Sequence, residues 1–411
     1  MQLRLDIITT TPKQIREKIF STLDNYKEIF PASKEARILI KPNLNANMNA
    51  LTGNTTDLRL LASVIMYLKD KGYKDISIAE GTNSGYYRNK ISVITRLRVD
   101  AMAKRFGAKV KDLNYSEPVF IPFEDGVKGG IAKDCLEADL LINIPKLKTH
   151  FEAGMSVCLK NLMGCLVGQE NKKKTHKSLA RNILHINEHI KPNLHIVDGL
   201  IAMEGLGPTR GTPVNMGLII AGVDPFLIDL LCAELAMFDH KKVTTLRMAE
   251  VLGLLKKEHH DFIKSLNIDG HKRKFLSPRG SLAARFIHSP KRQKYFLAIR
   301  NTKVFNYLCS TKIGGKILFK TGLRQDVFIE DEMSCKGLSI DWEKCTRCGK
   351  CADYCPIDIN LPDGLDNEGN SCIHCLYCFM VCPEKAIIFK GEFGFVSEQL
   401  RQYDDIVRKI A

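Results

Sequence analysis

The sequence lacks a long hydrophobic run. Its most apolar stretch, residues 216–233, is broken by Asp224, Pro225 and Asp229, whereas a membrane-spanning helix needs about 20 apolar residues in succession. The first residues, MQLRLDIITTTPKQ, also lack the apolar core of a signal peptide. We therefore expect a cytoplasmic protein without a transmembrane helix.

Low-complexity composition is absent as well. Only 15 of the 411 residues are proline, 45% are apolar and 26% are charged, and no repeat array is visible. These values are typical of globular proteins and exclude a disordered or collagen-like chain. At about 150 residues per domain, the length predicts two or three domains.

Acidic residues are scarce in one segment. Residues 256–324 contain 17 Lys and Arg but only three acidic residues, a net charge of +14 out of +15 for the whole chain. A ragged helical pattern within this segment predicts a basic helical connector over 256–335. Residues 256–324 could attract an acidic redox protein or an anionic membrane, although a solvated basic face without a partner is an equal alternative. Nucleic acid is not expected as a partner, because no recognised reading motif is present.

Cysteine is distributed just as unevenly. Eight of the 14 cysteines lie between Cys345 and Cys382, where the pattern C-x2-C-x2-C-x3-C-P occurs twice. In this pattern three thiolates of one half hold a 4Fe-4S cluster, and the fourth, before the proline, binds the other cluster. We predict two 4Fe-4S clusters, one held by Cys345, Cys348, Cys351 and Cys382 and the other by Cys372, Cys375, Cys378 and Cys355.

The paired motifs resemble the bacterial two-cluster ferredoxin, here with an additional loop over 357–371. The resemblance implies a small α+β domain over 336–390, and residues 391–411 are expected to form a closing amphipathic helix. Zinc is the alternative metal, but its structural sites use ligands in pairs rather than three plus one. Such clusters usually transfer single electrons, and a purely structural role is the alternative.

Before residue 255 short apolar runs rich in β-formers alternate with helical patterns. The runs occupy 37–43, 75–82, 139–146, 193–199 and 216–224. This alternation predicts an α/β domain over 1–255 with an open, mostly parallel sheet covered by helices.

Polar residues follow these runs, where ligands of open parallel sheets bind. Lys146, Lys148 and His150 alternate, so they share one face of an extended chain, and that face could hold an anion. Lys160 lies in an apolar segment between two glycines, where it either extends to the surface or has a lowered pKa and acts as a nucleophile or base. The catalytic candidates are Lys160, Lys148 and His150, and the ligand-binding candidates are Lys41, Asn43, Glu80, Lys146, Asn161 and His176. A solvated strand end is the alternative.

Several motifs over residues 35–250 together resemble the family called domain of unknown function 362, which is often fused to ferredoxin modules. They are Lys41-Pro-Asn43, Glu80-Gly-Thr82, Ile144-Pro-Lys146-Leu-Lys148-Thr-His150, Leu159-Lys160-Asn161-Leu-Met-Gly164 and Glu204-Gly-Leu-Gly-Pro208. A fainter similarity is to the N-terminal domain of nickel-pincer lactate racemases. That similarity implies His150 and His176 as metal ligands and Lys160 as a contact to an additional cofactor.

The sequence thus predicts an iron-sulfur oxidoreductase that couples two 4Fe-4S clusters to an anionic small molecule bound by the α/β domain. One alternative is an electron carrier without catalysis, in which the α/β domain only docks a redox partner. Another is a racemase-like, non-redox metal enzyme with structural clusters.

Overall fold

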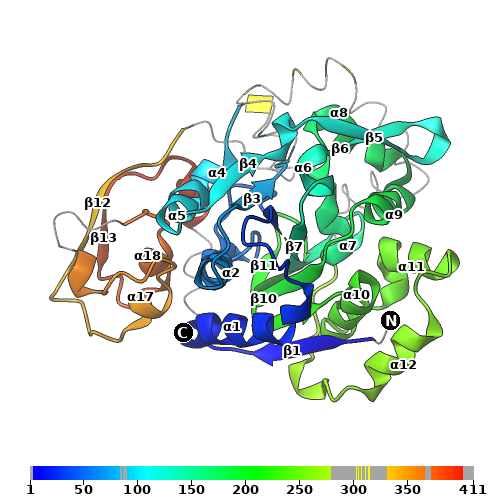
Figure 1. The fold of residues 1–411 in the computed structure, drawn as a ribbon. Helices are drawn as coiled ribbons and strands as arrows, with labels where there is room; N and C mark the ends of the chain where they lie inside the picture. The colour runs from blue at the N-terminus through cyan, green and yellow to red at the C-terminus, as the bar shows by residue number, and fades with distance from the viewer. Residues whose placement is uncertain are drawn as a thin grey trace.

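The computed structural model describes residues 3–83, 90–278, 331–365 and 372–400, with a few isolated residues between these ranges. Most of the expected basic connector and residues 401–411 of the expected closing helix lie outside the described residues. Figure 1 shows an α/β body with a smaller module, coloured orange to red, at one edge.

One mixed sheet forms the centre of the α/β body. Its strand order is β1-β11-β10-β7-β2-β3-β4, with β8 paired to β10 and to β9. From β10 to β4 all neighbours are parallel, whereas β11 is antiparallel to β10 and β1. The predicted open, mostly parallel sheet is therefore confirmed. The strands are β1 (Leu5–Thr9), β2 (Ile38–Pro42), β3 (Ile76–Glu80), β4 (Lys109–Asp112), β7 (Leu140–Ile144), β8 (Lys146–His150), β9 (Gly154–Ser156), β10 (Leu194–Glu204) and β11 (Thr212–Gly222).

Helices cover both faces of this sheet. Successive strand residues point to opposite sides, and apolar residues on both sides need a covering layer. Ile38 and Ile40 share one core with residues of α1, α2 and α5, whereas Leu39 belongs to a core with residues of α9 and of the hairpin β5–β6. The helices are α1 (Ile15–Asn25), α2 (Leu58–Asp70), α4 (Val93–Arg96), α5 (Val99–Arg105), α6 (Lys133–Leu136), α7 (Cys158–Asn161), α8 (Gly168–Thr175), α9 (Leu179–His189), α10 (Pro225–Leu235), α11 (Thr244–Val251) and α12 (Lys257–Ser265); β5 is Pro118–Pro122 and β6 is Lys128–Ala132.

The start of the expected connector packs onto the α/β body. Helix α12 lies against α10, and Ile263 and Phe275 are buried in the same core as Leu231. Residues after 255, at least as far as Phe275, therefore pack as part of this body. Within the described ranges, no helix has the length and apolar character needed to cross a bilayer.

The C-terminal module is a small α+β unit. Strand β12 (Ser334–Ile340) is antiparallel to β13 (Ile387–Glu392), and α17 (Lys350–Asp353) and α18 (Tyr377–Val381) lie between them in sequence. Residues 391–392, expected in a helix, end a strand, and a 3-10 helix follows at Gly394–Glu398. The module shares one hydrophobic core with α1, α2 and α5, so the two parts are in intimate contact.

Candidate functional site

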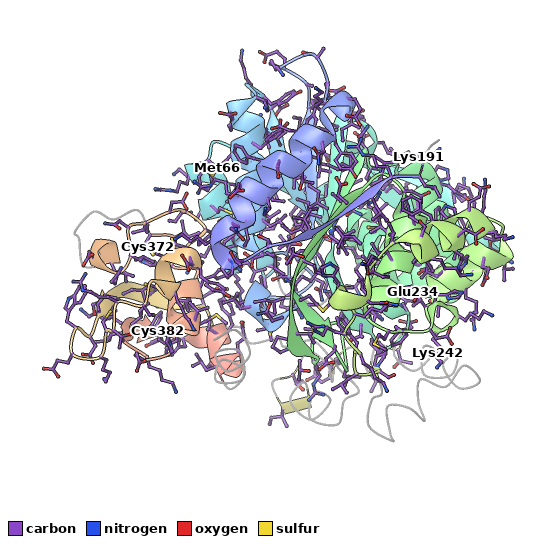
Figure 2. The ribbon with its side chains drawn as sticks, turned by 90° about the horizontal axis from the view of Figure 1, so that it is seen from below. Met66, Lys191, Glu234, Lys242, Cys372 and Cys382 are labelled. Atoms are coloured by element: carbon purple, nitrogen blue, oxygen red, sulfur yellow. The ribbon has the colours of Figure 1, made fainter. Side chains whose placement is uncertain are left out.

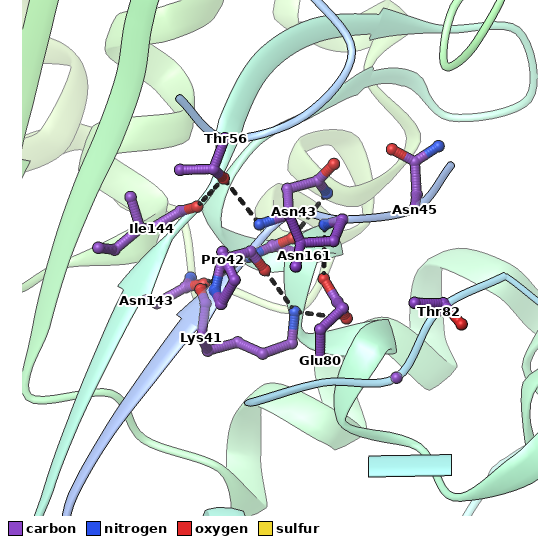
Figure 3. Close-up of polar contacts among 12 residues, drawn as sticks. Lys41, Pro42, Asn43, Asn45, Thr56, Glu80, Thr82, Asn143, Ile144 and Asn161 are labelled. Carbon is purple, nitrogen blue, oxygen red and sulfur yellow. Dashed lines mark hydrogen bonds and ion pairs between the residues drawn. The ribbon is translucent and has the colours of Figure 1, made fainter. Parts of the chain in front are cut away.

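Lys41 and Glu80 form a buried ion pair at the carboxyl ends of β2 and β3 (Figure 3). Lys41 Nζ lies 2.9 Å from Glu80 Oε1 and donates to the Pro42 carbonyl at 2.7 Å. The other carboxylate oxygen of Glu80 accepts from the Leu44 amide at 2.8 Å. Both side chains are almost fully buried. Their charges are therefore satisfied within the chain.

Three asparagine side chains link β2, β7 and α7 next to this pair. Asn43 Nδ2 donates to Asn161 Oδ1 at 2.7 Å, and Asn161 Nδ2 donates to Asn143 Oδ1 at 2.7 Å. A second bond from Asn161 reaches the Pro42 carbonyl at 3.2 Å. This network fixes α7, and with it the neighbouring Lys160, against the ends of the strands.

Lys148 is buried, and neutral oxygens surround its ammonium group. Its Nζ donates to Asn43 Oδ1 at 2.7 Å, to Asn45 Oδ1 at 2.6 Å and to the Asn54 carbonyl at 2.7 Å. Burial, together with the positive charge of Lys160, lowers the pKa of Lys148 well below its usual value. All three donor positions of an ammonium group are thus occupied by oxygens of the same chain.

Lys146 is buried in an ion pair with Asp198. Lys146 Nζ lies 2.9 Å from Asp198 Oδ2, which also accepts from the Asp57 amide at 2.7 Å. Asp57 in turn caps α2 through the Arg59 amide and binds the Arg59 guanidinium at 2.7 Å. A chain of polar contacts thus runs from β8 to the start of α2.

His150, Glu152 and His176 form a group that is less enclosed. The Nδ1 atom of His150 accepts from the backbone amides of Glu152 and Ala153, at 3.1 and 3.2 Å, so its neutral ring carries the proton on Nε2. Burial, together with the charge of Lys160, lowers the pKa of His150 well below its usual value. His176 Nδ1 lies 3.2 Å from the carboxylate of Glu152. Burial opposes the charge of Glu152, but His176 holds the pKa of that carboxyl well below its usual range.

Lys160, at the end of α7, is partly exposed. Among the described residues, no hydrogen bond or ion pair occupies its ammonium group. Burial lowers the pKa of Lys160 to about 8, and the nearby Glu152 opposes this shift. Lys160 is therefore mostly charged at neutral pH and half-charged near pH 8, so it can bind an anion or exchange a proton.

The predicted residues thus fall into two sets. Lys41, Asn43, Glu80, Lys146, Lys148 and Asn161 are buried and bonded to one another, to neighbouring polar side chains or to the backbone, whereas His150, Lys160 and His176 gather around Glu152. This placement differs from the open anion-binding face expected for β8. Oxygen atoms from other strands and loops accept the hydrogen bonds of its two lysine ammonium groups. The catalytic and ligand-binding roles of the set around Glu152 remain predictions.

Two residues with side-chain contacts at the site, Glu152 and Lys172, were not among the candidates predicted from the sequence. Lys172 Nζ donates to the Gly81 and Thr82 carbonyls at 2.9 and 2.8 Å and holds the turn after β3. In sequence it looks like part of a basic run, and no local signal marks its contact with this distant turn. Glu152 lies between His150 and the predicted Gly-flanked segment, so its position next to two candidates was the available signal.

The eight cysteines of the two repeated motifs line two cavities in two sets of four. Cys345, Cys348, Cys351 and Cys382 line one cavity, and Cys355, Cys372, Cys375 and Cys378 line the other. Each set combines three cysteines of one half with the last cysteine of the other half, as the spacing predicts.

The backbone repeats with the cysteines. Arg347 and His374, each just before the second cysteine of its half, have φ of 54° and 54°. Gly349 and Leu376, just after that cysteine, also have positive φ. Both halves therefore turn their chain around a cavity in the same way.

Local donors and burial suit an iron-sulfur cluster. The His374 amide lies 3.4 Å from Cys372 Sγ, and the Ala386 amide lies 3.3 Å from Cys382 Sγ, contacts of the kind that tune cluster potentials. Burial raises the pKa of the Cys378 thiol well above its usual value, so a thiolate there requires a positive partner such as iron. The donor set thus fits iron-sulfur binding.

Comparisons with known proteins define the class of this chain. Residues 38–234 match the family described as "Domain of unknown function (DUF362)", and residues 338–359 match the 4Fe-4S binding domain. The chain is therefore an iron-sulfur protein that carries a domain of the DUF362 family. This finding confirms both the family resemblance and the ferredoxin-type motif.

Two particular proteins are similar to it. A thylakoid-associated protein, sll1697, from Synechocystis is 28% identical over 235 residues, which cover 53% of this chain and 68% of that protein. The lactate racemase apoprotein from Thermoanaerobacterium thermosaccharolyticum aligns over 56% of this chain and 57% of its own, with 14% identity and a TM-score of 0.38.

Proposed function

We propose that the protein is an oxidoreductase in which two 4Fe-4S clusters serve a small-anion site formed by His150, Lys160 and His176. Clusters of this type exchange single electrons when bound. The interleaved cysteine sets described above support two clusters. The ammonium group of Lys160, a partly exposed residue, and the Nε2–H of His150 are donors suited to a carboxylate or a similar anion.

The observation that carries this proposal is the loop 43–57, which joins the module to the α/β site. On the module side, Asn49 Nδ2 donates to the Cys375 carbonyl at 3.2 Å, and Tyr377 Oη accepts from the amide of Leu58, the residue after the loop, at 3.1 Å. Cys375 is one of the cavity-lining cysteines. One wall of a cluster cavity is thus bonded directly to this loop.

On its other side the same loop contacts the lysines of β8. Asn43, Asn45 and Asn54 accept from Lys148, and the Asp57 amide donates to Asp198, the partner of Lys146. Lys148 and Lys160 are close enough for the charge of one to lower the pKa of the other. Hydrogen bonds therefore connect the Cys375 cavity to Lys148, and the charge of Lys160 in the proposed anion site acts on Lys148.

The test starts from protein purified anaerobically with its clusters. Small molecules that co-purify are identified by mass spectrometry, and each anion found is added back to dithionite-reduced protein while the visible absorbance of the clusters is followed. We expect the anion to reoxidise the clusters in the native protein and in Lys27→Ala, where an exposed lysine far from the site is removed. Lys160→Ala should lose this response and keep its iron.

Each other result favours an alternative. If an anion binds without any change in cluster oxidation state, the redox proposal fails and the non-redox enzyme is favoured. If no anion binds and Lys160→Ala behaves as the native protein does, the α/β domain is a docking module of an electron carrier.

A racemase-like, non-redox enzyme is the second candidate. It is favoured by one observation, the pairing of Lys160, whose pKa is about 8, with a neutral His150, because a base with a pKa near the working pH is suited to proton transfer. Nickel or another metal in addition to about eight irons per chain, lost in His150→Ala, would support it. Iron alone would count against a metal at these histidines.

The basic segment 256–324 supports a second part of the proposal, contact with an anionic membrane face or an acidic redox protein. Residues beyond 278 in it, apart from a few isolated ones, lie outside the described ranges. The similar Synechocystis protein is described as thylakoid-associated, which favours the membrane. Flotation with anionic liposomes should recover the protein at low salt and lose it at high salt. If it floats equally with neutral liposomes, the electrostatic contact is refuted.

The cytoplasm is the compartment we propose.

A further inference from the structure

Three potential metal ligands meet on the α/β body, and none of them belongs to the site above. They are His240, in the turn before α11, Glu250 of α11 and His260 of α12. Their ligand atoms all lie within 4.8 Å of one another. The His240 and His260 rings have centroids 5.1 Å apart. We propose that these three side chains bind a divalent transition-metal ion, Zn²⁺ in the first place.

An unpartnered nitrogen supports this assignment. His240 Nε2 is buried and has no hydrogen-bond partner within the described part of the chain. Its nearest carboxylate oxygen, Glu250 Oε2, lies 3.9 Å away, beyond hydrogen-bond distance. A buried polar atom without a partner is costly, and an absent ion is one of its standard explanations. A metal between these two atoms would bond both of them.

The distances suit a zinc site with a small side-chain adjustment. Zinc binds histidine nitrogen and carboxylate oxygen at about 2.0–2.2 Å, so two tetrahedral ligands lie roughly 3.4 Å apart. The three ligand atoms lie within 4.8 Å of one another, so the separations exceed that value by roughly 1.4 Å at most. Glu250 is 41% exposed, so its carboxylate is free to rotate toward the histidines.

The donor chemistry selects the ion. Two imidazoles with one carboxylate favour zinc and related transition metals, whereas Mg²⁺ and Ca²⁺ prefer sites made of oxygen ligands. Three protein ligands would leave a coordination position for water. The metal would link α11 to α12, both of which pack against α10.

The location separates this ion from the clusters. Figure 2 shows Lys242, in the same turn as His240, on the opposite side of the molecule from Cys372 and Cys382. Binding here can therefore be measured while the clusters stay in place. The three ligands are also not residues of the proposed anion site, so the inference does not rest on the proposed redox function.

The experiment uses full-length, cluster-loaded protein, titrated anaerobically with Zn²⁺ against a competing chelator. We expect one zinc per chain, in addition to any zinc bound by the cysteines of molecules that lack clusters. The iron content and the cluster absorbance should not change. At saturating zinc the melting temperature of the α/β body should rise by about 5 °C or more. His240→Ala and His260→Ala should weaken binding at least tenfold, because even the loss of a residue that only supports a ligand costs about 10–100-fold.

Two further variants keep the test decisive. His189→Ala removes an exposed histidine of α9 and should bind zinc as the native protein does. Glu250→Gln keeps the shape of the side chain, so it should fold and still lose affinity. Zinc binding that is unchanged in Glu250→Gln and His240→Ala, or absent from the native protein, would overturn the proposal.

Discussion

Replacing Gly164 by alanine should destabilise the α/β body, because the glycine packs directly on the Lys41–Glu80 pair. A Cβ atom at this position would overlap Glu80 Oε1 and would lie 2.7 Å from Lys41 Nζ. Neither partner can move freely, since Glu80 is also held by the Leu44 amide and Lys41 by the Pro42 carbonyl. The added methyl group must therefore separate the pair or displace the backbone of α7's neighbouring turn.

The magnitude follows from these contacts. Overpacking a tight core costs about 1–3 kcal/mol, and leaving one member of a buried ion pair unpaired costs about 3–5 kcal/mol. We expect the free energy of unfolding to fall by about 3 kcal/mol, which corresponds to a decrease of roughly 6–12 °C in melting temperature for a domain of this size.

Gly270→Ala is the matched control, because an added Cβ there meets nothing within 4 Å. Both variants are loaded with clusters, their iron is measured, and thermal unfolding is followed by far-UV circular dichroism. Gly270→Ala should unfold like the native protein. If Gly164→Ala unfolds at the same temperature as Gly270→Ala, Gly164 does not pack against the buried pair and the reasoning is refuted.

Three further predictions concern the cysteines, the anion site and the second buried pair. Cys375→Ala should lower the iron content from about eight to about four per chain. Cys335 lines neither cavity, so Cys335→Ala should leave the iron content unchanged. Equal loss of iron in both variants would argue against the cysteine assignment. Binding of the co-purifying anion, measured by calorimetry, should weaken as the pH rises through about 8, where Lys160 loses its proton, and Lys160→Gln should abolish this dependence; a native profile in that variant would exclude Lys160. Asp198→Asn leaves the Lys146 ammonium buried beside a neutral amide, so urea unfolding should show a loss of about 3–5 kcal/mol, and a loss under 1 kcal/mol would mean that the pair is not desolvated.

The sequence predicted the parts of the structure that depend on local spacing. The cysteine sets could be assigned because each half places its thiols within a few residues. Positive φ values at Arg347 and His374 show that the backbone turns in the same way in both halves. The central strands were predictable for a similar reason, since apolar runs such as 139–146 can be buried only between helix layers.

Long-range partners could not be predicted. The alternation of Lys146 and Lys148 predicts a shared face, but whether that face is open depends on Asp198 and on asparagines from the loop 43–57. The antiparallel direction of β11 also depends on its pairing with β10 and β1 and has no local signature. Likewise, the Lys172 side chain is held by the carbonyls of Gly81 and Thr82, which lie far away in sequence.

The core that the module shares with the α/β body has a consequence for how the two parts stay together. The module is attached through side chains, among them Tyr354, stacked against the Arg59 guanidinium 4.1 Å from its ring centroid, and Gln399, bonded to the Asn47 carbonyl at 2.6 Å. Covalent continuity along the intervening peptide is therefore not required to hold the module in place. A protein nicked there by a protease should elute from a sizing column as a single particle, and two fragments should be seen only after denaturation.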